Sequence, residues 1–144
     1  MLKVKLINSN AFPPKKKYEG DAGFDVFAPY DFELRPGGIK KINLGFAVEF
    51  DPGNVLLVQT KSSLAEIGIE TIGNVIDSTY RGPIHVIMVN LSHEYRYFKK
   101  GQKIAQLILF KCYTGTKVEV VDELSKTERG SRGFGSTGKF YNER

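Results

Sequence analysis

The chain has 144 residues, of which 41% are hydrophobic and 26% charged, a balance typical of one soluble globular domain. No apolar run approaches the ~20 residues of a membrane span, and residues 1–5 lack a signal-peptide core, so we expect no membrane partner and an intracellular protein, cytoplasmic or nuclear. Cys112 is the single cysteine, which excludes an intramolecular disulfide, and the net charge of +5 suits an anionic ligand, either a nucleotide or a nucleic acid.

Short apolar segments separated by glycine and proline turns predict an antiparallel sandwich, barrel or jelly roll. One brief helix is expected at 63–67. The pattern stops after Leu124, so we expect a β domain over 1–124 and a glycine-rich arm over 125–144. The expected strands are 2–7, 31–34, 42–50, 55–59, 69–76, 84–91, 104–110 and 118–121.

The first chemical candidate is the stretch 21–26, in which Asp21 and Asp25 flank a small Ala-Gly step. Gly23 allows the backbone to approach a neighbour closely. The two acids could orient a metal-bound water or a basic partner. The alternative is a simple turn followed by a strand.

Residues 60–68 predict the end of a strand and the start of a short helix. Ser63 stands three residues before Glu66, as in a capping box. The same helix start offers backbone N–H groups, the hydroxyls of Ser62 and Ser63, and the charge of Lys61 to an anion. Ser63 can serve as a cap and as an anion ligand at once.

Asp77 lies at the tip of a predicted hairpin, between the strand at 69–76 and the strand that opens at Ile84. Loops on a rigid scaffold often carry functional side chains, so Asp77 is a candidate functional carboxylate. The alternative is a turn residue whose side chain bonds its own backbone.

Gln106 follows the turn at Gly101, and strand alternation places it on the same apolar face as Ile104 and Ile108 unless the strand is twisted or bulged. A buried unpaired amide costs about 1–3 kcal/mol. Gln106 therefore needs a partner, which could be a backbone carbonyl or a ligand.

The stretch 129–138 holds four glycines, which let a backbone fold around phosphate oxygens. Arg129 and Ser136 supply charge and hydrogen bonds, and Phe134 offers a ring for stacking. Such a segment could be a plain linker. An arm that orders over a bound substrate would instead be a lid.

In order and spacing, five stretches resemble the five sequence motifs of the trimeric dUTPases: 21–26, 61–68, 75–82, 101–108 and 129–138. The resemblance implies an all-β, distorted jelly-roll (β-clip) subunit with a flexible C-terminal arm. It implies a homotrimer with active sites at subunit boundaries. It also implies Mg²⁺-dependent hydrolysis of dUTP to dUMP and pyrophosphate, which limits uracil incorporation into DNA and supplies dUMP for thymidylate synthesis.

The resemblance further implies roles for single residues. Asp77 becomes the general base that activates water for attack on the α-phosphorus. Tyr80 lies against the deoxyribose, and the backbone of Asn74, Val75, Ile76 and Asp77 reads the uracil edge. Mg²⁺ rides on the triphosphate and its waters without a direct protein ligand, and Asp25 orients this water shell. The remaining substrate contacts come from Lys61, Ser62, Ser63, Gln106, Arg129, Phe134, Gly135 and Ser136, with Phe134 closing over the base from a neighbouring subunit's arm.

Four positions depart from the commonest family pattern. Lys61 replaces an arginine, so a bidentate fork becomes a point charge. Asn74 replaces a glycine, and asparagine tolerates left-handed backbone better than most residues. Thr79 stands where an acid is common, and Pro83 replaces a glutamate and removes one backbone donor. These changes bear on fine specificity and oligomer contacts more than on the reaction class.

Two other functions compete with this interpretation. A dCTP deaminase on this fold needs a further glutamate near the pyrimidine, and the strand at 84–90 supplies none. A nucleic-acid-binding or regulatory module could use Lys15, Lys16 and Lys17, which read most simply as a solvated loop, and its affinity would fall steeply with salt. That role does not require Asp77, Tyr80 and Phe134 together, so a nucleic-acid partner is not expected. His85 and His93 are read as structural or surface residues.

Overall fold

The computed structural model describes residues 1–134 and confirms the all-β prediction. Eleven strands and one four-residue helix are found in this part of the chain. In chain order they are β1 (Lys3–Leu6), β2 (Gly23–Phe27), β3 (Phe32–Leu34), β4 (Ile39–Asn43), β5 (Phe46–Glu49), β6 (Asn54–Gln59), α1 (Ser62–Ala65), β7 (Ile69–Ile72), β8 (Val75–Asp77), β9 (His85–Asn90), β10 (Arg96–Phe98) and β11 (Lys103–Lys111).

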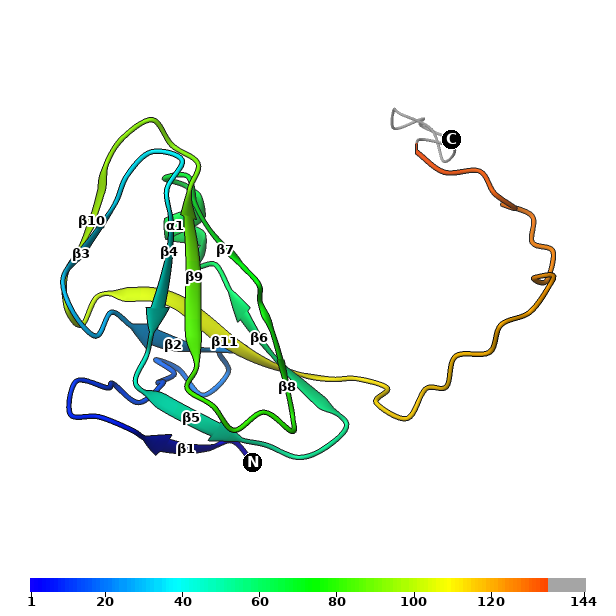
Figure 1. The fold of residues 1–144 in the computed structure, drawn as a ribbon, viewed down its shortest axis with the longest axis horizontal. Helices are drawn as coiled ribbons and strands as arrows, with labels where there is room; N and C mark the ends of the chain where they lie inside the picture. Colours follow the sequence, from blue (N-terminus) through cyan, green and yellow to red (C-terminus); the bar gives the residue numbers. More distant parts are fainter. Residues whose placement is uncertain (135–144) are drawn as a thin grey trace.

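All strand pairs are antiparallel and form two larger sheets and two small ribbons (Figure 1). The four-stranded sheet has the order β2-β11-β6-β8, and the three-stranded sheet has the order β4-β9-β7. The ribbons are β1-β5 and β10-β3. This topology places β8, which ends at Asp77, at the free edge of the larger sheet.

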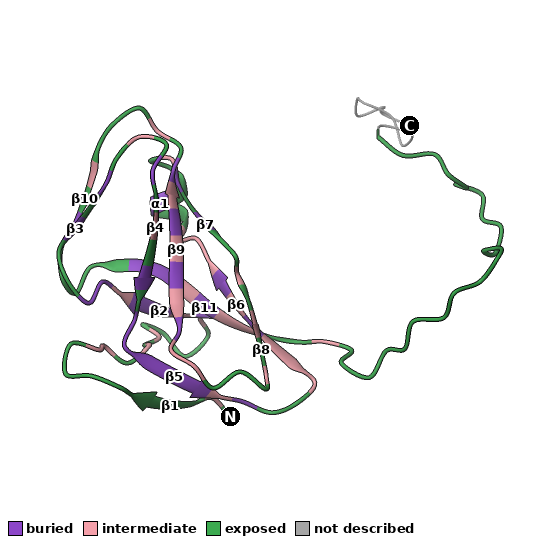
Figure 2. Ribbon diagram, viewed as in Figure 1, coloured by how far each residue is buried: buried purple, intermediate pink, exposed green. Residues whose placement is uncertain are grey.

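One hydrophobic core is shared by both sheets, because alternate residues of their strands turn inward (Figure 2). The four-stranded sheet contributes Leu56 and Leu107, and the three-stranded sheet contributes Ile42, Val86 and Met88, all fully buried. The opposite face of the four-stranded sheet remains partly open to solvent, and the candidate polar residues lie on it.

Two segments that were expected as single strands are each divided in two. The segment 42–50 turns at Gly45, whose φ is 75° and whose amide donates to Asn43 Oδ1 at 2.8 Å. The segment 69–76 turns at Gly73, with φ 66°. As a result β7 pairs with β9, whereas β8 crosses to the other sheet and pairs with β6. The expected uninterrupted strand into Asp77 is therefore wrong.

The capping-box prediction is also wrong. The N-cap of α1 is Lys61, which makes no side-chain cap bond, and Ser63 is the second residue of the helix. Glu66 already stands at the C-cap, so the helix is too short for a box that spans Ser63 to Glu66. The buried side chain of Leu64 fastens this single turn to the core.

The chain leaves the body after β11 and residues 112–134 run away from it without regular secondary structure (Figure 1). The strand expected at 118–121 is absent, because Val118 and Val120 are 93% and 94% exposed and find no strand to pair with in residues 1–134. The short β10 was not predicted; its Phe98 ring stacks on Phe32 at 4.8 Å. No helix within 1–134 is long and apolar enough to cross a membrane.

Candidate functional site

A polar pocket of about 290 Å³ lies where β2, β11 and the end of β6 meet, and we call it the Asp25 pocket. It brings together three of the stretches singled out in the sequence, 21–26, 61–68 and 101–108. Its lining residues are Lys17, Tyr18, Asp21, Ala22, Gly23, Asp25, Lys61, Lys103 and Gln106.

The Asp25 carboxylate is held between two lysines. Lys103 Nζ lies 2.7 Å from Asp25 Oδ2, and Lys61 Nζ donates to Oδ1. Burial alone raises the pKa of this carboxyl, but the hydrogen bonds and charges of Lys103 and Lys61 outweigh burial and lower the pKa below its ordinary 3.8. Asp25 is therefore ionised, and the group of two lysines and one carboxylate keeps an excess positive charge that suits an anion.

A β-bulge aims Gln106 into this pocket. The register of β11 against β2 shifts between Lys103 and Ala105, so Ile104 and Ala105 are both buried. Gln106 consequently leaves the face of Ile104, which is the bulged arrangement that the alternation argument had left open. Its Nε2 donates to the Thr60 carbonyl at 3.3 Å, so a backbone carbonyl supplies the partner that the amide needs.

Gly23 is required by this arrangement. A Cβ on Gly23 would lie 2.7 Å from Gln106 Oε1, closer than side-chain contacts allow. The close approach that glycine was expected to permit is therefore the packing of Gln106 over the backbone of β2.

Lys61 is positioned by the residue before it. Thr60 Oγ1 accepts from the Thr71 amide at 2.8 Å and lies 3.0 Å from Thr71 Oγ1, which fixes the end of β6 against β7. Ser62 and Ser63 follow at the start of α1 with exposed side chains, beside Lys61. The second motif thus presents one charge and two hydroxyls at the rim of the pocket.

A second pocket, of about 490 Å³, lies beside the edge strand β8. The Val58 amide donates to the Asn74 carbonyl at 2.9 Å. Because ladder bonds alternate along an antiparallel pair, the N–H and C=O groups of Val75 and Asp77 point away from β6 toward the free edge. This pocket is lined by Asn54, Val55, Leu57, Val75, Asp77, Ser78, Thr79, Cys112 and Thr114.

The left-handed backbone expected near Asn74 belongs to Gly73. Asn74 Nδ2 donates to the Thr71 carbonyl at 3.1 Å, while its buried Oδ1 has no partner in residues 1–134. Asn74 therefore braces the entry into β8 with its side chain and has no need of an unusual backbone conformation.

After Asp77 the chain forms a compact loop. The Tyr80 amide donates to the Asp77 carbonyl at 3.1 Å, and the Tyr80 hydroxyl donates to the Pro83 carbonyl at 3.1 Å. The ring of Tyr80 lies directly on Gly82, where an added Cβ would meet the phenol oxygen at 2.3 Å. The orientation of Tyr80 therefore depends on both Gly82 and Pro83.

Asp77 and Gln106 share the solvent-facing side of the four-stranded sheet but lie at opposite ends of β6. Asp77 is opposite Val55, and Gln106 is opposite Gln59, four residues farther along β6. Four residues span about 13 Å, and two strand spacings of about 4.8 Å separate β8 from β11, so the two Cα atoms are about 16 Å apart. One chain does not bring Asp77 to the Asp25 pocket.

The arm residues also lie outside both pockets. Arg129 and Phe134 are exposed, and Arg129 Nε donates to the Arg132 carbonyl at 2.9 Å. Gly135 and Ser136 lie outside the described residues.

Sequence reasoning did not assign to this pocket three of its lining residues, Lys17, Tyr18 and Lys103, or Thr60, whose carbonyl accepts from Gln106. Lys103 could have been predicted from the sequence, because it lies in the fourth motif three residues before Gln106. The main-chain bridge between Lys15 and Asp25, which places the lysine run against β2, is a long-range contact with no local signal. No cluster of three or more His, Cys, Asp or Glu side chains is found in the part of the chain that the structure describes.

Comparisons with known proteins agree with these features. A family model described as dUTPase matches residues 9–138. The deoxyuridine 5'-triphosphate nucleotidohydrolase of Nautilia profundicola is 40% identical over 141 residues, covering 96% of this chain and 99% of that protein. The corresponding Clostridium kluyveri protein is 41% identical, covering 95% and 97%. The Pol polyprotein of caprine arthritis encephalitis virus is 41% identical over 127 residues, and this chain spans 11% of its length.

Solved structures show the same fold. A mutant dUTPase of Staphylococcus bacteriophage 80alpha, determined with dUpNHpp, superposes with a TM-score of 0.85 at 27% identity and covers 96% of this chain and 99% of its own. The dUTPase of phage phi11 superposes with a TM-score of 0.80 at 22% identity, covering 88% and 99%. The jelly-roll fold is thereby confirmed, and the chain belongs to the dUTPase family.

Proposed function

We propose that Asp77 is the general base with which this dUTP diphosphatase hydrolyses dUTP to dUMP and pyrophosphate. Three separate motifs meet in the Asp25 pocket, and this observation supports the binding of a polyphosphate by Lys61, Lys103 and Gln106. The exposed carboxylate of Asp77, at the end of the edge strand β8 on the same sheet face, supports its assignment as the base. The reaction then needs a base within hydrogen-bond reach of the attacking water, which contributes typically about 10²–10⁴-fold.

The triphosphate binds at the Asp25 pocket. Lys61 Nζ and Gln106 Nε2 donate to phosphate oxygens, and the hydroxyls of Ser62 and Ser63 complete the contact at the rim. Within the chain, Lys61 donates a hydrogen bond to Asp25. Substrate binding therefore exchanges one anionic partner of Lys61 for another, while Lys103 keeps Asp25 ionised.

The pocket also suits a Mg²⁺ ion carried by the substrate. Asp25 offers carboxylate oxygens at the wall of the pocket, and Mg²⁺ prefers oxygen ligands and retains several waters. Asp25 would accept hydrogen bonds from those waters and so orient the ion. When bound, Mg²⁺ neutralises charge on the phosphate oxygens.

The base and sugar are recognised at the edge of β8. The outward N–H and C=O groups of Val75 and Asp77 form a donor and acceptor row that a uracil edge can match as an added strand would. Cytosine presents its donors and acceptors in the reverse order, so its binding would leave buried polar groups unpaired. Such a site discriminates strongly between uracil and cytosine. Tyr80 lies against the deoxyribose and leaves no room for a 2′-hydroxyl.

The active site is completed by a second copy of the chain in a homotrimer. Within one chain Asp77 lies about 16 Å from Gln106, too far for one dUTP to meet the base and the phosphate ligands together. The sheet face between them is apolar and partly open: Val75 is 66% exposed and Phe110 47%. A neighbouring subunit that covers this face would bring its own Asp77 to the Asp25 pocket. Arg129, Phe134, Gly135 and Ser136 would come from the arm of a neighbour.

The test of the reaction is pyrophosphate release from dUTP with Mg²⁺, compared with dCTP, dTTP and UTP and repeated with Asp77→Asn. Selective release that is lost in the variant supports the assignment. Ammonia release from dCTP would indicate a deaminase. No turnover of any nucleotide would indicate a binding module on this fold.

The test of the shared site is complementation between two inactive variants. Asp77→Asn and Lys61→Ala subunits are each expected to be inactive alone. After mixed refolding at equal amounts, about a quarter of the sites in a cyclic trimer combine an intact Asp77 with an intact Lys61 from the neighbour. If mixtures stay as inactive as either variant, the base and the phosphate ligands do not come from different subunits.

A further inference from the structure

The loop 78–82, between β8 and β9, is held together largely by Arg81. Arg81 Nη1 donates to the Ser78 carbonyl at 2.6 Å and to the Tyr80 carbonyl at 3.0 Å. These bonds fall on either side of the turn that carries Tyr80. Both bonds come from Nη1, which leaves Nε of the same planar guanidinium free to face a second partner, a division that a single ammonium cannot reproduce.

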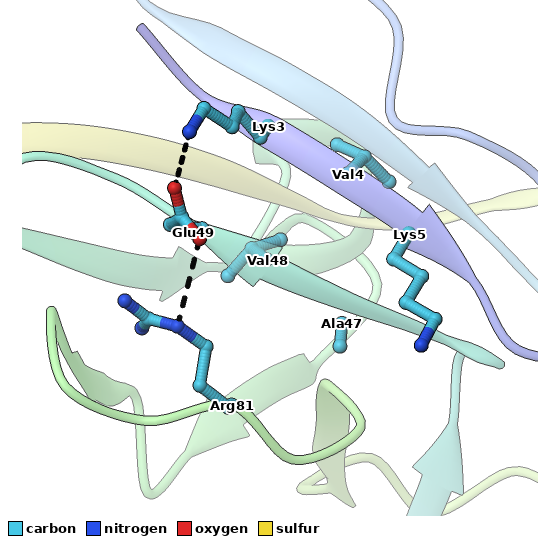
Figure 3. A pocket seen from close by; sticks show the side chains of 7 residues that line it. All are labelled: Lys3, Val4, Lys5, Ala47, Val48, Glu49 and Arg81. Atoms are coloured by element: carbon cyan, nitrogen blue, oxygen red, sulfur yellow. Dashed lines mark hydrogen bonds and ion pairs between the residues drawn. The ribbon is translucent and has the colours of Figure 1, made fainter.

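The same guanidinium ties the loop to the body of the protein. Arg81 Nε lies 3.9 Å from Glu49 Oε2 on β5, and the other oxygen of Glu49 accepts from Lys3 Nζ, directly opposite on β1 (Figure 3). Within residues 1–134, the hydrogen bonds of 78–82 stay inside the segment 77–83, and the Arg81–Glu49 ion pair links this loop to another strand.

We propose that Arg81 and Glu49 are positioning residues for dUTP hydrolysis: they set the place of the loop that follows Asp77 and carries Tyr80. This inference rests on the proposed roles of Asp77 and Tyr80. Arg81 fixes the shape of the loop through two carbonyls, and Glu49 fixes the direction of the guanidinium. Lys3 braces Glu49 in turn, so the N-terminal strand contributes to the site without touching the substrate.

The exposure of these side chains separates positioning from stability. Arg81 and Glu49 are 53% and 46% exposed, and ion pairs at such exposure contribute little to global stability. If the pair has only a structural role, its removal should therefore change neither the thermal midpoint nor the turnover rate. If the pair positions the loop, its removal should lower turnover and dUTP/UTP selectivity while the protein still unfolds at the same temperature.

The experiment compares Glu49→Gln, Arg81→Ala and Arg81→Lys with a matched control, Lys5→Ala. Glu49 and Arg81 line a pocket of about 370 Å³, and Lys5 lines it with them but makes no ion pair in the described residues (Figure 3). The readouts are kcat and KM for dUTP and for UTP, together with the thermal midpoint. Asp77→Asn is measured in the same series.

We expect Arg81→Ala to lower kcat for dUTP by roughly 10- to 100-fold, the cost of a displacement near 1 Å, with a smaller change in KM. The ratio of kcat/KM for dUTP over UTP falls with it. Glu49→Gln gives a smaller loss in the same direction. Arg81→Lys stays low because one ammonium cannot stand both where Nη1 meets the two carbonyls and where Nε faces Glu49. The kcat and KM of Lys5→Ala stay near the wild-type values. The thermal midpoint of Glu49→Gln also stays near that of wild type.

Values of kcat and selectivity within twofold of wild type in both Glu49→Gln and Arg81→Ala would overturn the inference. So would an equal loss in Lys5→Ala, which would point to general attraction of the anionic substrate, or full activity in Arg81→Lys. If Arg81→Ala does not fold, the kcat and selectivity of Glu49→Gln alone test the inference. Retained turnover in Asp77→Asn refutes the proposed function itself, so the two failures are distinguishable.

Discussion

Replacing Gly82 with alanine is expected to damage sugar selection through Tyr80. A Cβ at position 82 would lie 2.3 Å from the Tyr80 phenol oxygen, 2.6 Å from Cζ and 2.9 Å from Cε2, whereas ordinary contacts begin near 3.4 Å. The ring must therefore retreat by about 1 Å, a displacement of the size that costs up to roughly 100-fold when it misplaces a reacting group. The retreat also stretches the 3.1 Å bond from the Tyr80 hydroxyl to the Pro83 carbonyl beyond hydrogen-bonding range.

The two consequences act on different measurements. Loss of one hydrogen bond at an exposed site costs about 0.5–1.5 kcal/mol of stability at most, so the variant should fold. Loss of the ring from the sugar pocket should lower kcat/KM for dUTP by about 10- to 100-fold. UTP should suffer less, because the space that Tyr80 leaves can accept a 2′-hydroxyl.

The assay is steady-state pyrophosphate release from dUTP and UTP by Gly82→Ala, beside Tyr80→Ala and the control Gly115→Ala. A Cβ on Gly115 meets no atom within 4 Å, so this control should behave as wild type. Equal dUTP/UTP discrimination in Gly82→Ala and wild type would refute the assigned role of the Tyr80 ring.

Three further changes test other parts of the structure. Gly23→Ala places a Cβ 2.7 Å from Gln106 Oε1, so KM for dUTP should rise, and unchanged KM would exclude Gln106 as a phosphate ligand. Burial, and then Lys41, lower the pKa of His85 below its ordinary 6.5, so the unfolded chain binds the extra proton and stability should fall as pH drops through 6.5. His85→Gln should flatten that fall in urea titrations across this range. Deletion of 125–144 should leave a folded protein with little turnover, and full activity would refute the lid.

The sequence was most informative where a pattern is local. Alternation of apolar and polar residues located β6, β9 and β11 to within one residue at each end, because a strand with one buried face has a period of two. The motif residues Asp25, Lys61 and Gln106 were found because glycines, hydroxyls and charges stand at fixed offsets in 21–26, 61–68 and 101–108.

Errors occurred where a glycine redirects the chain and the partner strand is distant. At Gly45 and Gly73 the apolar run continues in sequence, so it predicts one strand, yet a positive φ divides it. Only the pairing of β8 with β6, some twenty residues away, shows that the second half belongs to a different sheet. The edge position of β8, on which the proposed base recognition depends, follows from that crossing and from no local signal.

The bulge in β11 illustrates the same limit inside the site. Alternation places Gln106 beside Ile104, whereas the extra residue at 103–105 turns both Ile104 and Ala105 inward and sends Gln106 outward. A one-residue slip exchanges every side chain between the two faces. The orientation of Gln106, the proposed phosphate ligand, thus results from an irregularity that the composition of the strand does not predict.

The placement of Asp77 and Gln106 on one sheet face explains how separate motifs can serve one reaction. Both side chains point to the same side of the four-stranded sheet, because Val55 and Gln59 have the same parity along β6. A neighbouring copy that covers this face therefore meets both ends of it, and each contact between copies can join the Asp77 of one chain to the Asp25 pocket of another. On this proposal, each chain supplies two half-sites, and the trimer makes each of them part of a whole site.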